Sequence, residues 1–298
     1  MNVASKHSIT GKLMFDEPMS KHTSWRLGGP ADRYYVPGDL QDLQNYLAAL
    51  STDLDILWVG LGSNMLVRDG GFRGQVIAPL NALNEIHLNE DGSLYAESGV
   101  SCAKLAKFCR KQGLADADFF AGIPGTVCGA LAMNAGAFGG ETWAAVEQLI
   151  MLDRYGRLVE RSATEFEVGY RRVRLPQQQE WFAAALFCFD ERVAGEDSNI
   201  RQLLQQRNAT QPIGQPSCGS VFKNPPGKHA AQLIEAAGLK GYCLGAACVS
   251  DKHANFIISS SATTASDVEA LIEHIRATVT AKFDIRLESE VRIVGEAL

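Results

Sequence analysis

The sequence predicts an α+β protein built from several lobes. Strand-like and helix-like stretches alternate along roughly the first 80 residues, and short strands and turns follow through the middle third. Near the C-terminus, a strongly amphipathic helix is expected over 266–283, and strict apolar–polar alternation follows over 285–293. No repeat of solenoid length accompanies these elements, so the three observations together favour α+β.

Each expected element has its own local signal. Leucines at helical spacing predict the first helix, and Ser101 and Gly113 are a candidate N-cap and C-terminal stop for the second. Gly238 plays the same stopping role for a third helix. The expected helices are 39–50, 101–113, 200–207, 229–237 and 266–283. The expected strands are 31–37, 55–60, 94–100, 149–153, 156–161, 182–190, 253–259 and 285–293, with a strand, an Asp-Gly turn and a strand over 65–80 and a linker, GEDSN, at 195–199.

Composition narrows the function classes. A 46% apolar content with 21% charged residues is ordinary for a globular protein with a substantial core. The formal charge of −6 gives no general attraction to nucleic acid or anionic lipid, so we expect neither partner. The first residues, MNVASKHSITGKL, have no apolar core and do not resemble a signal peptide. No apolar run approaches the length of a membrane span.

The seven cysteines are scattered, odd in number and without a CxxC pair. This pattern predicts reduced thiols, most of them buried as small apolar groups, and no metal site. Cys218 lies two residues before Ser220 and could be a nucleophile, but no cationic neighbour is evident to lower its pKa.

Two glycine-rich loops stand out. Glycine loop 1 is Gly60-Leu61-Gly62-Ser63-Asn64. It follows a strand, but Met65 stands where a Rossmann fingerprint has its third glycine, and no P-loop lysine is present. The loop either presents backbone N–H groups to a phosphate or is a tight hairpin connection.

Glycine loop 2 covers 122–136. Its small side chains would let the backbone approach a flat or phosphorylated ligand closely, or would let a helix and turn pack tightly in the core. Its main residues are Gly122, Ile123, Pro124, Gly125, Thr126, Gly129, Asn134 and Gly136.

These loops, with five other blocks, resemble one family. GLGSNMLVRDGGFRG and AGIPGTVCGALAMNAGAFGGE resemble the two flavin-binding loops of the UDP-N-acetylenolpyruvoylglucosamine reductase (MurB) family. HTSWRLGGPADRYYVP, GYRR, CGSVFKNP, SDKHANFII and LESEVRIVG resemble its other motifs and stand in the family's order. The blocks run from residue 22 to residue 295, so the resemblance covers essentially the whole chain.

The resemblance implies a fold and its division. It implies a two-lobed FAD-binding unit of the PCMH/vanillyl-alcohol-oxidase type and a C-terminal α+β substrate domain. The implied divisions are 1–80 and 81–210 for the two FAD-binding lobes, 211–284 for the substrate domain and 285–298 for the C-terminal strand. The short span between Arg171 and the strand at 182–190 resembles the shorter branch of the family, which lacks an inserted element.

The resemblance also implies a reaction. It implies bound FAD, NADPH as reductant, a UDP-sugar substrate and a monomeric enzyme in the cytoplasm. The enolpyruvyl ether of the UDP-sugar would be reduced to UDP-N-acetylmuramate for peptidoglycan synthesis. The implied FAD-binding residues are those of glycine loops 1 and 2, and the implied substrate-binding residues are Tyr170, Lys223 and Asn224.

Three residues are implied in catalysis. Hydride addition to the β-carbon builds negative charge at the α-carbon and its carboxylate, which needs electrostatic stabilisation and a proton. By resemblance, Arg171 binds the carboxylate, Glu290 lies against it and Ser220 donates the proton. A charged Glu290 would repel the enolate, so we expect it to be protonated or compensated by Arg171. Lys223 could help to polarise Ser220.

Each of these residues has an ordinary alternative. Arg171 could be a surface arginine of the run RRVR, Glu290 a solvated residue on a strand, and Ser220 a local turn residue. Lys223 and Asn224 could be exposed loop residues, and His253 a core histidine. A Ser220 nucleophile is excluded because Cys218 and Phe222 stand where a hydrolase elbow has glycines.

The chain also departs from the family pattern. Val173 and Leu175 stand where the family commonly has serine and phenylalanine, and Thr126 stands where serine is common. Two further functions remain open: a flavin-dependent oxidase and a non-catalytic nucleotide-binding sensor.

Overall fold

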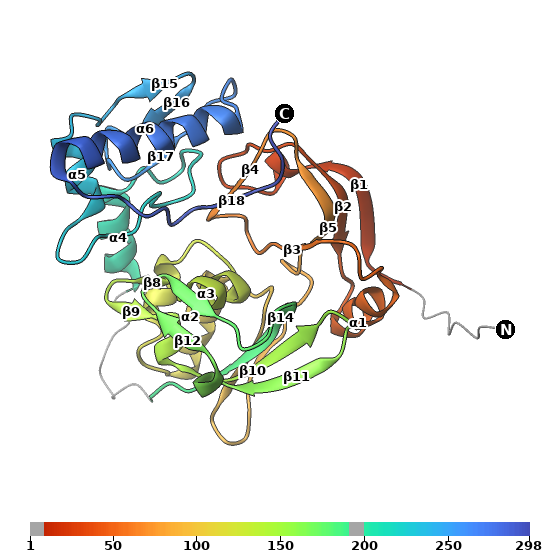
Figure 1. Cartoon of the computed structure of the whole chain (residues 1–298). Coiled ribbons are helices and arrows are strands. Elements are labelled where there is room, and N and C mark those ends of the chain that lie inside the picture. The colour runs from red at the N-terminus through yellow and green to blue at the C-terminus, as the bar shows by residue number, and fades with distance from the viewer. Residues whose placement is uncertain (1–8, 191–199) are drawn as a thin grey trace. The chain divides into compact units, whose positions relative to one another are not determined.

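The computed structural model describes residues 9–190 and 200–298 (Figure 1). These residues form two compact units, each assembled from separate segments of the chain. The first unit contains residues up to 15 together with 33–60 and 74–203, and the second contains 16–32, 61–73 and 204–298. The chain leaves the first unit inside glycine loop 1, directly after Gly60.

A five-stranded antiparallel sheet organises the first unit. Helix α3 packs on its strands β14 and β7, and its core includes Phe120, Leu131, Leu149 and Phe187. The sheet order is β11(Leu158–Ser162)-β10(Val146–Asp153)-β14(Glu180–Phe187)-β7(Leu94–Glu97)-β6(Ile86–Leu88). The unit also contains α1(Leu40–Ala49), α2(Cys102–Gln112), α3(Val127–Met133) and the hairpins β8(Gly136–Ala137)-β9(Gly140–Glu141) and β12(Glu167–Gly169)-β13(Arg172–Arg174).

A second sheet has the order β1(Lys12–Pro18)-β2(Pro30–Val36)-β5(Phe72–Ile77)-β3(Ile56–Trp58). The division between the units passes through β1, β2 and β5. Strands β3 and β5 pair in parallel, with Leu57 opposite Val76.

Both predicted ends of α2 are confirmed, since Ser101 accepts a hydrogen bond from Lys104 N at its start. Asp39, which we did not predict as a cap, accepts one from Asp42 N at the start of α1. Gly113 ends α2 with φ +73°, a conformation that glycine adopts without strain. Capping therefore fixes where α2 begins and ends, as the sequence indicated.

The second unit is built around its longest helix. Helix α6(Ala265–Phe283) packs on β15 and β16, and it buries the predicted apolar stripe of Val268, Leu271, Ile272, Ile275 and Val279. Asp69 holds the start of α6 by accepting from Ala265 N and Ser266 N, each at 2.9 Å. The unit's other elements are α4(Ile200–Thr210), of which 204–210 belong here, α5(Ala230–Ala236), the sheet β15(Cys243–Leu244)-β16(Ala247–Val249)-β17(Ile257–Ile258) and the parallel pair β4(Met65–Val67)-β18(Arg292–Val294).

The strand, Asp-Gly turn and strand expected over 65–80 are present as β4 and β5, although β4 pairs with β18 and not with β5. Two other strand predictions need correction. The alternating stretch 285–293 yields only the short strand β18 and a bridge between Phe222 and Ser289. The strand expected over 253–259 shrinks to β17, because residues 250–256 form a compact turn in which Ser250 N donates to Phe256 O. Sequence alternation marks burial here, but strand length depends on which neighbour is available to pair.

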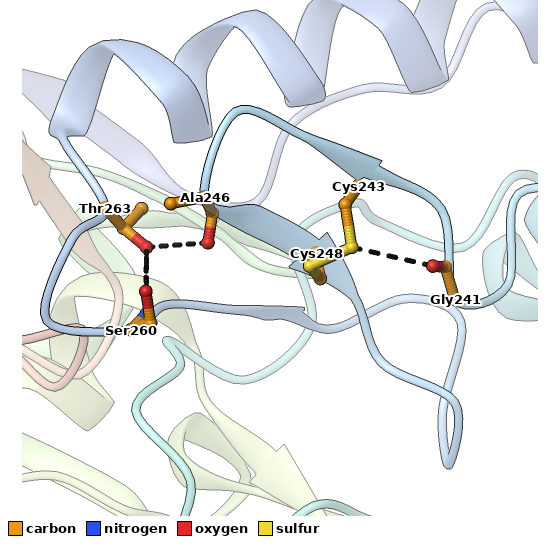
Figure 2. The surroundings of a disulfide bond; sticks show 6 residues. All are labelled: Gly241, Cys243, Ala246, Cys248, Ser260 and Thr263. Carbon is orange, nitrogen blue, oxygen red and sulfur yellow. Dashed lines mark hydrogen bonds between the residues drawn. A yellow bond between two sulfur atoms is a disulfide. The ribbon is translucent and has the colours of Figure 1, made fainter.

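The prediction of reduced cysteines is wrong for one pair. Cys243 and Cys248 form a disulfide (Figure 2). Antiparallel pairing of β15 with β16 places these two residues directly opposite each other. A search for CxxC spacing misses such a pair, because the partners are brought together across a hairpin. Cys102, Cys109, Cys128 and Cys218 are free and buried, as expected, and Cys188 is free and exposed.

The predicted domain divisions at 80, 210 and 284 stay a prediction. The predicted domains are continuous stretches of the chain, whereas each compact unit combines separate segments. The linker predicted at 195–199 and the first eight residues lie outside the described residues. Among the described helices, none is long and apolar enough to cross a membrane.

Candidate active site

Close packing fixes glycine loop 1. Gly62 has φ +66°, and a Cβ added there would lie 2.0 Å from the carbonyl oxygen of His22. Its own carbonyl accepts a hydrogen bond of 3.1 Å from Ser24 N. A side chain at position 62 would therefore meet backbone atoms that cannot move aside, so the second glycine of the loop is required by packing.

Glycine loop 2 contacts the start of loop 1 inside the first unit. A Cβ at Gly60 would lie 2.3 Å from Thr126 Oγ1, and Thr126 is fully buried. Thr126 Oγ1 also lies 3.1 Å from Cys128 Sγ. The structure thus brings Gly60 and Thr126 together, although they are far apart in the sequence.

The surface of glycine loop 2 fits a flat ligand. Gly125, Gly129 and Gly136 are each partly exposed, and no atom lies within 3.8 Å of the position that a Cβ on Gly129 would take. A ligand can therefore approach the backbone of α3 closely. The residues present fit an FAD group that is held by backbone and small side chains.

Arg171 is tied to the end of the same loop. It lies at the tip of the β12-β13 hairpin with φ +52°, and its guanidinium donates to Asn134 O at 3.2 Å and Gly136 O at 2.9 Å. Asn134 is the C-cap of α3, so the cation lies at the negative end of that helix. Tyr170 beside it is half exposed, with its ring 5.5 Å from the guanidinium carbon.

Asn134 is an internal anchor. Its Nδ2 donates to Glu141 Oε2 at 3.0 Å and to Gly169 O at 3.3 Å, and its Oδ1 accepts from Trp143 N at 3.2 Å. It is 2% exposed and takes the left-handed conformation, φ +42°, that ends α3. Through Gly169, its side chain also supports the hairpin that carries Arg171.

In the second unit, the serine segment (residues 216–225) runs beside the segment that carries Glu290. Glu290 N donates to Val221 O at 2.8 Å, and Lys223 N donates to Glu288 O at 2.9 Å. Ser220 directly precedes this pairing and follows Gly219, whose φ is +79°. Two residues predicted for catalysis, 70 positions apart in the sequence, are therefore on adjacent backbone segments.

Asn64 joins glycine loop 1 to the Glu290 segment. Its Nδ2 donates to Glu290 O at 2.9 Å, and its carbonyl accepts from Arg292 N at 3.1 Å. These bonds continue into the parallel pair β4-β18. Asn64, the last residue of glycine loop 1, is thus hydrogen-bonded to the backbone of the segment that carries Glu290.

The remaining polar candidates have specific partners. Lys223 Nζ lies 2.6 Å from Glu288 Oε1, so this ammonium is already paired. Asn224 Oδ1 accepts from Ala230 N at 3.0 Å and caps α5. His253 Nδ1 accepts from Asn255 N at 3.3 Å, and burial lowers the pKa of its imidazole.

The Cys218 thiol is not activated. Burial raises its pKa well above the usual value, and the negative charge of Glu290 raises the pKa further. A nucleophilic thiolate at neutral pH is therefore disfavoured. Among the described residues, no group of histidine, cysteine, aspartate or glutamate side chains could hold a metal ion.

Comparison with known proteins decides the family. Residues 31–162 match the family described as FAD binding domain, and residues 211–294 match the C-terminal domain of UDP-N-acetylenolpyruvoylglucosamine reductase. A UDP-N-acetylenolpyruvoylglucosamine reductase from Alkalilimnicola ehrlichii is 52% identical over all of this chain and 99% of its own length. The chain belongs to the UDP-N-acetylenolpyruvoylglucosamine reductase family.

Other members agree along their whole length. The reductase from Methylococcus capsulatus is 53% identical and aligns over 96% of this chain and 94% of its own. The crystal structure of the MurB reductase from Thermus caldophilus superposes with a TM-score of 0.79, at 28% identity, over 95% of this chain and 98% of that one. The predicted α+β class, with an FAD-binding domain followed by a reductase C-terminal domain, is confirmed, and FAD is the cofactor of this family member.

Sequence reasoning did not single out Asn255. It is 4% exposed and makes hydrogen bonds on both sides of Phe222, two residues after Ser220. The signal available was its position inside the matched block SDKHANFII, but the partner of an asparagine amide cannot be read from one sequence.

Proposed function

We propose that this chain reduces UDP-N-acetylglucosamine enolpyruvate to UDP-N-acetylmuramate with NADPH. In support, its relatives are named UDP-N-acetylenolpyruvoylglucosamine reductase. It would act as a monomer in the cytoplasm, where this precursor of peptidoglycan is made. Glycine loops 1 and 2 would hold FAD. A bound FAD would supply hydride-transfer chemistry between NADPH and the enolpyruvyl β-carbon.

The protein's own residues stabilise the charge and supply the proton. The Arg171 guanidinium, fixed against Asn134 O and Gly136 O, binds the substrate carboxylate on which negative charge develops. Glu290 lies against the same carboxylate in protonated or compensated form. The Ser220 hydroxyl gives its proton to the α-carbon. Tyr170, Lys223 and Asn224 contact the rest of the UDP-sugar.

The observation that carries the proposal is the pairing of the serine segment with the Glu290 segment. The 2.8 Å bond from Glu290 N to Val221 O and the bridge between Phe222 and Ser289 keep the two catalytic candidates on adjacent backbone segments. This supports a shared role for Ser220 and Glu290 that a surface serine and a solvated glutamate would not require.

A two-step anaerobic titration tests the proposal. The purified protein is loaded with FAD, and its visible spectrum is recorded as NADPH and then the enolpyruvyl UDP-sugar are added. We expect bleaching on the first addition and recovery of the flavin bands on the second. A protein that cannot be loaded with FAD, or whose reduced flavin ignores the sugar, would contradict the proposal.

The same titration distinguishes the reductase from a flavin-dependent oxidase and from a nucleotide sensor. A flavin-dependent oxidase would recover its flavin bands with oxygen and consume oxygen in stoichiometric amounts, whereas the reductase consumes NADPH and sugar in equal amounts. A nucleotide sensor would be yellow, but NADPH would not bleach it.

A further inference from the structure

The backbone of the serine segment has a second partner, on the side away from Glu290. Phe222 N donates to Asn255 Oδ1 at 3.0 Å, and Asn255 Nδ2 donates to Phe222 O at 2.8 Å. Val221 N donates to Asn255 O at 2.9 Å. The Asn255 amide thus pairs with Phe222 as a peptide group of a neighbouring strand would.

With this pairing, the serine segment lies between two hydrogen-bonded neighbours, the 288–290 segment and Asn255. The N–H of Lys223 and the carbonyl of Val221 bond to the 288–290 segment, and the N–H and carbonyl of Phe222 bond to Asn255. The serine segment is therefore held from both edges directly after Ser220. Because Phe222 and Asn255 are 1% and 4% exposed, the two Phe222 groups are shielded from bulk solvent and depend on the amide for their hydrogen bonds.

The residue type matches the task. An asparagine amide has an acceptor and donors on one rigid plane, so it satisfies both Phe222 groups at once. Aspartate would keep the acceptor but, when ionised, would face the Phe222 carbonyl without a donor. Alanine would remove both bonds and leave two buried backbone groups unpaired.

We propose that Asn255 is the positioning residue of the proton donor: its amide fixes Phe222, and thereby the place of the Ser220 hydroxyl two residues earlier. The functional part of this inference rests on the proposed reductase activity. Asn255 does not itself touch the reacting atoms. Its contribution is expected in the step that needs Ser220 and not in the reduction of the flavin by NADPH.

Anaerobic stopped-flow measurements on Asn255→Ala test the inference. We expect the rate of flavin reduction by NADPH to stay within about twofold of wild type. We expect sugar-dependent reoxidation to slow about tenfold to a hundredfold, because a misplacement of about 1 Å costs rates of that order. Asn89→Ala, which removes an amide bonded to Ser93 Oγ in a turn of the first unit, is the matched control and should leave both rates unchanged.

A double variant separates positioning from general support of the fold. If Asn255 acts through Ser220, Ser220→Ala/Asn255→Ala should reoxidise no more slowly than Ser220→Ala alone. Multiplied losses in the double variant, or equal losses in both half-reactions of the single one, would overturn the inference. Asn255→Asp, which keeps the size of the side chain, replaces Asn255→Ala if the latter does not bind FAD.

Hydrogen exchange of the FAD-free protein tests the contact without activity. In Asn255→Ala, peptides over 219–224 should exchange at least tenfold faster than in wild type, while peptides over 268–279 in α6 stay unchanged. If both variants fail to fold, the wild type decides: an unprotected Phe222 amide would overturn the inference. A wild type without sugar-dependent reoxidation would instead refute the proposed function, and the exchange result would still stand.

Discussion

Glycine loop 1 and the serine segment are held in place by opposite means. Glycine loop 1 keeps its path because side chains are missing: a Cβ at Gly60 or Gly62 would lie within 2.3 Å of a neighbouring atom. The serine segment keeps its path because the Asn255 side-chain amide bonds to both the N–H and the carbonyl of Phe222. One region depends on close approach and the other on hydrogen bonding.

The difference predicts which substitutions each region tolerates. A loop fixed by close approach fails when any atom is added, however small. A segment fixed by an amide is destabilised even by a substitution that keeps the side-chain volume, because buried donors or acceptors lose their partners.

Gly62→Ala should have the largest effect on stability. It combines a side chain at φ +66° with a clash against the His22 carbonyl, so we expect a loss of about 3 kcal/mol or more. Gly238→Ala is the matched control, because Gly238 has φ +84° but no atom within 4 Å of its Cβ position, and it should cost only about 1–2 kcal/mol. Thermal unfolding of both variants measures the difference. Equal losses would mean that conformation alone, and not close approach, fixes the loop.

Asp42 offers a charged anchor for comparison with the neutral amide of Asn255. It is buried and accepts from the N–H groups of Thr10, Gly11 and Gly38 and from the Tyr35 hydroxyl. Burial alone would raise the pKa of this carboxyl, but the hydrogen bonds from Tyr35 and the three N–H groups together lower it.

Asp42→Asn should therefore cost about 2–3 kcal/mol at pH 7, because amide N–H groups would face N–H donors. A lowered folded-state pKa gives stability that is present above about pH 4 and is lost as the pH falls through the folded-state value. The melting temperatures of wild type and variant should accordingly converge when measured at decreasing pH. A gap that is independent of pH would show that Asp42 is not an ionised anchor.

The Cys243–Cys248 disulfide is a covalent anchor in the second unit, in contrast to the hydrogen-bonded anchors Asp42 and Asn255. Closing so short a loop limits its stabilisation to about 2 kcal/mol. Dithiothreitol should lower the melting temperature of wild type by a few degrees and leave the Cys243→Ser/Cys248→Ser double variant unchanged. Thiol titration of the denatured protein should rise from five to seven thiols on reduction. Seven thiols before reduction would contradict the bond.

Gly129→Ala should have the smallest effect on the fold. The added methyl group would meet only Thr126 Oγ1, at 3.8 Å, and alanine favours the helix over glycine. We expect the FAD-free protein to keep or gain up to about 1 kcal/mol. If this open position lies against FAD, the affinity for FAD should fall about tenfold, measured by flavin fluorescence. Unchanged affinity would place FAD elsewhere on the loop.

Local signals in the sequence predicted most of the elements. The leucine spacing of α1, the Ser101 cap of α2 and the apolar stripe of α6 located helices because their determinants lie within a few residues. Pairing partners could not be predicted in this way, since β4 finds its partner more than 200 residues away in β18. The Cys243–Cys248 bond was missed because it depends on the register of two short strands.

The candidate site shows the same limit. The resemblance selected Arg171, Ser220 and Glu290, but nothing local distinguishes them from surface residues. The structure adds what one sequence lacks: Arg171 is bound to the carbonyls after α3, and Glu290 N is bound to Val221 O. Asn255 escaped notice because its partners come from a segment more than 30 residues away.

The central claim is that Ser220 is the proton donor, and the two half-reactions of Ser220→Ala test it most directly. Ser217→Ala, three residues earlier in the same segment, is the control. Under anaerobic conditions, Ser220→Ala should be reduced by NADPH at the wild-type rate, whereas its reoxidation by the enolpyruvyl UDP-sugar should slow about a hundredfold or more. Equal losses in both half-reactions, or reoxidation at the wild-type rate, would contradict the account.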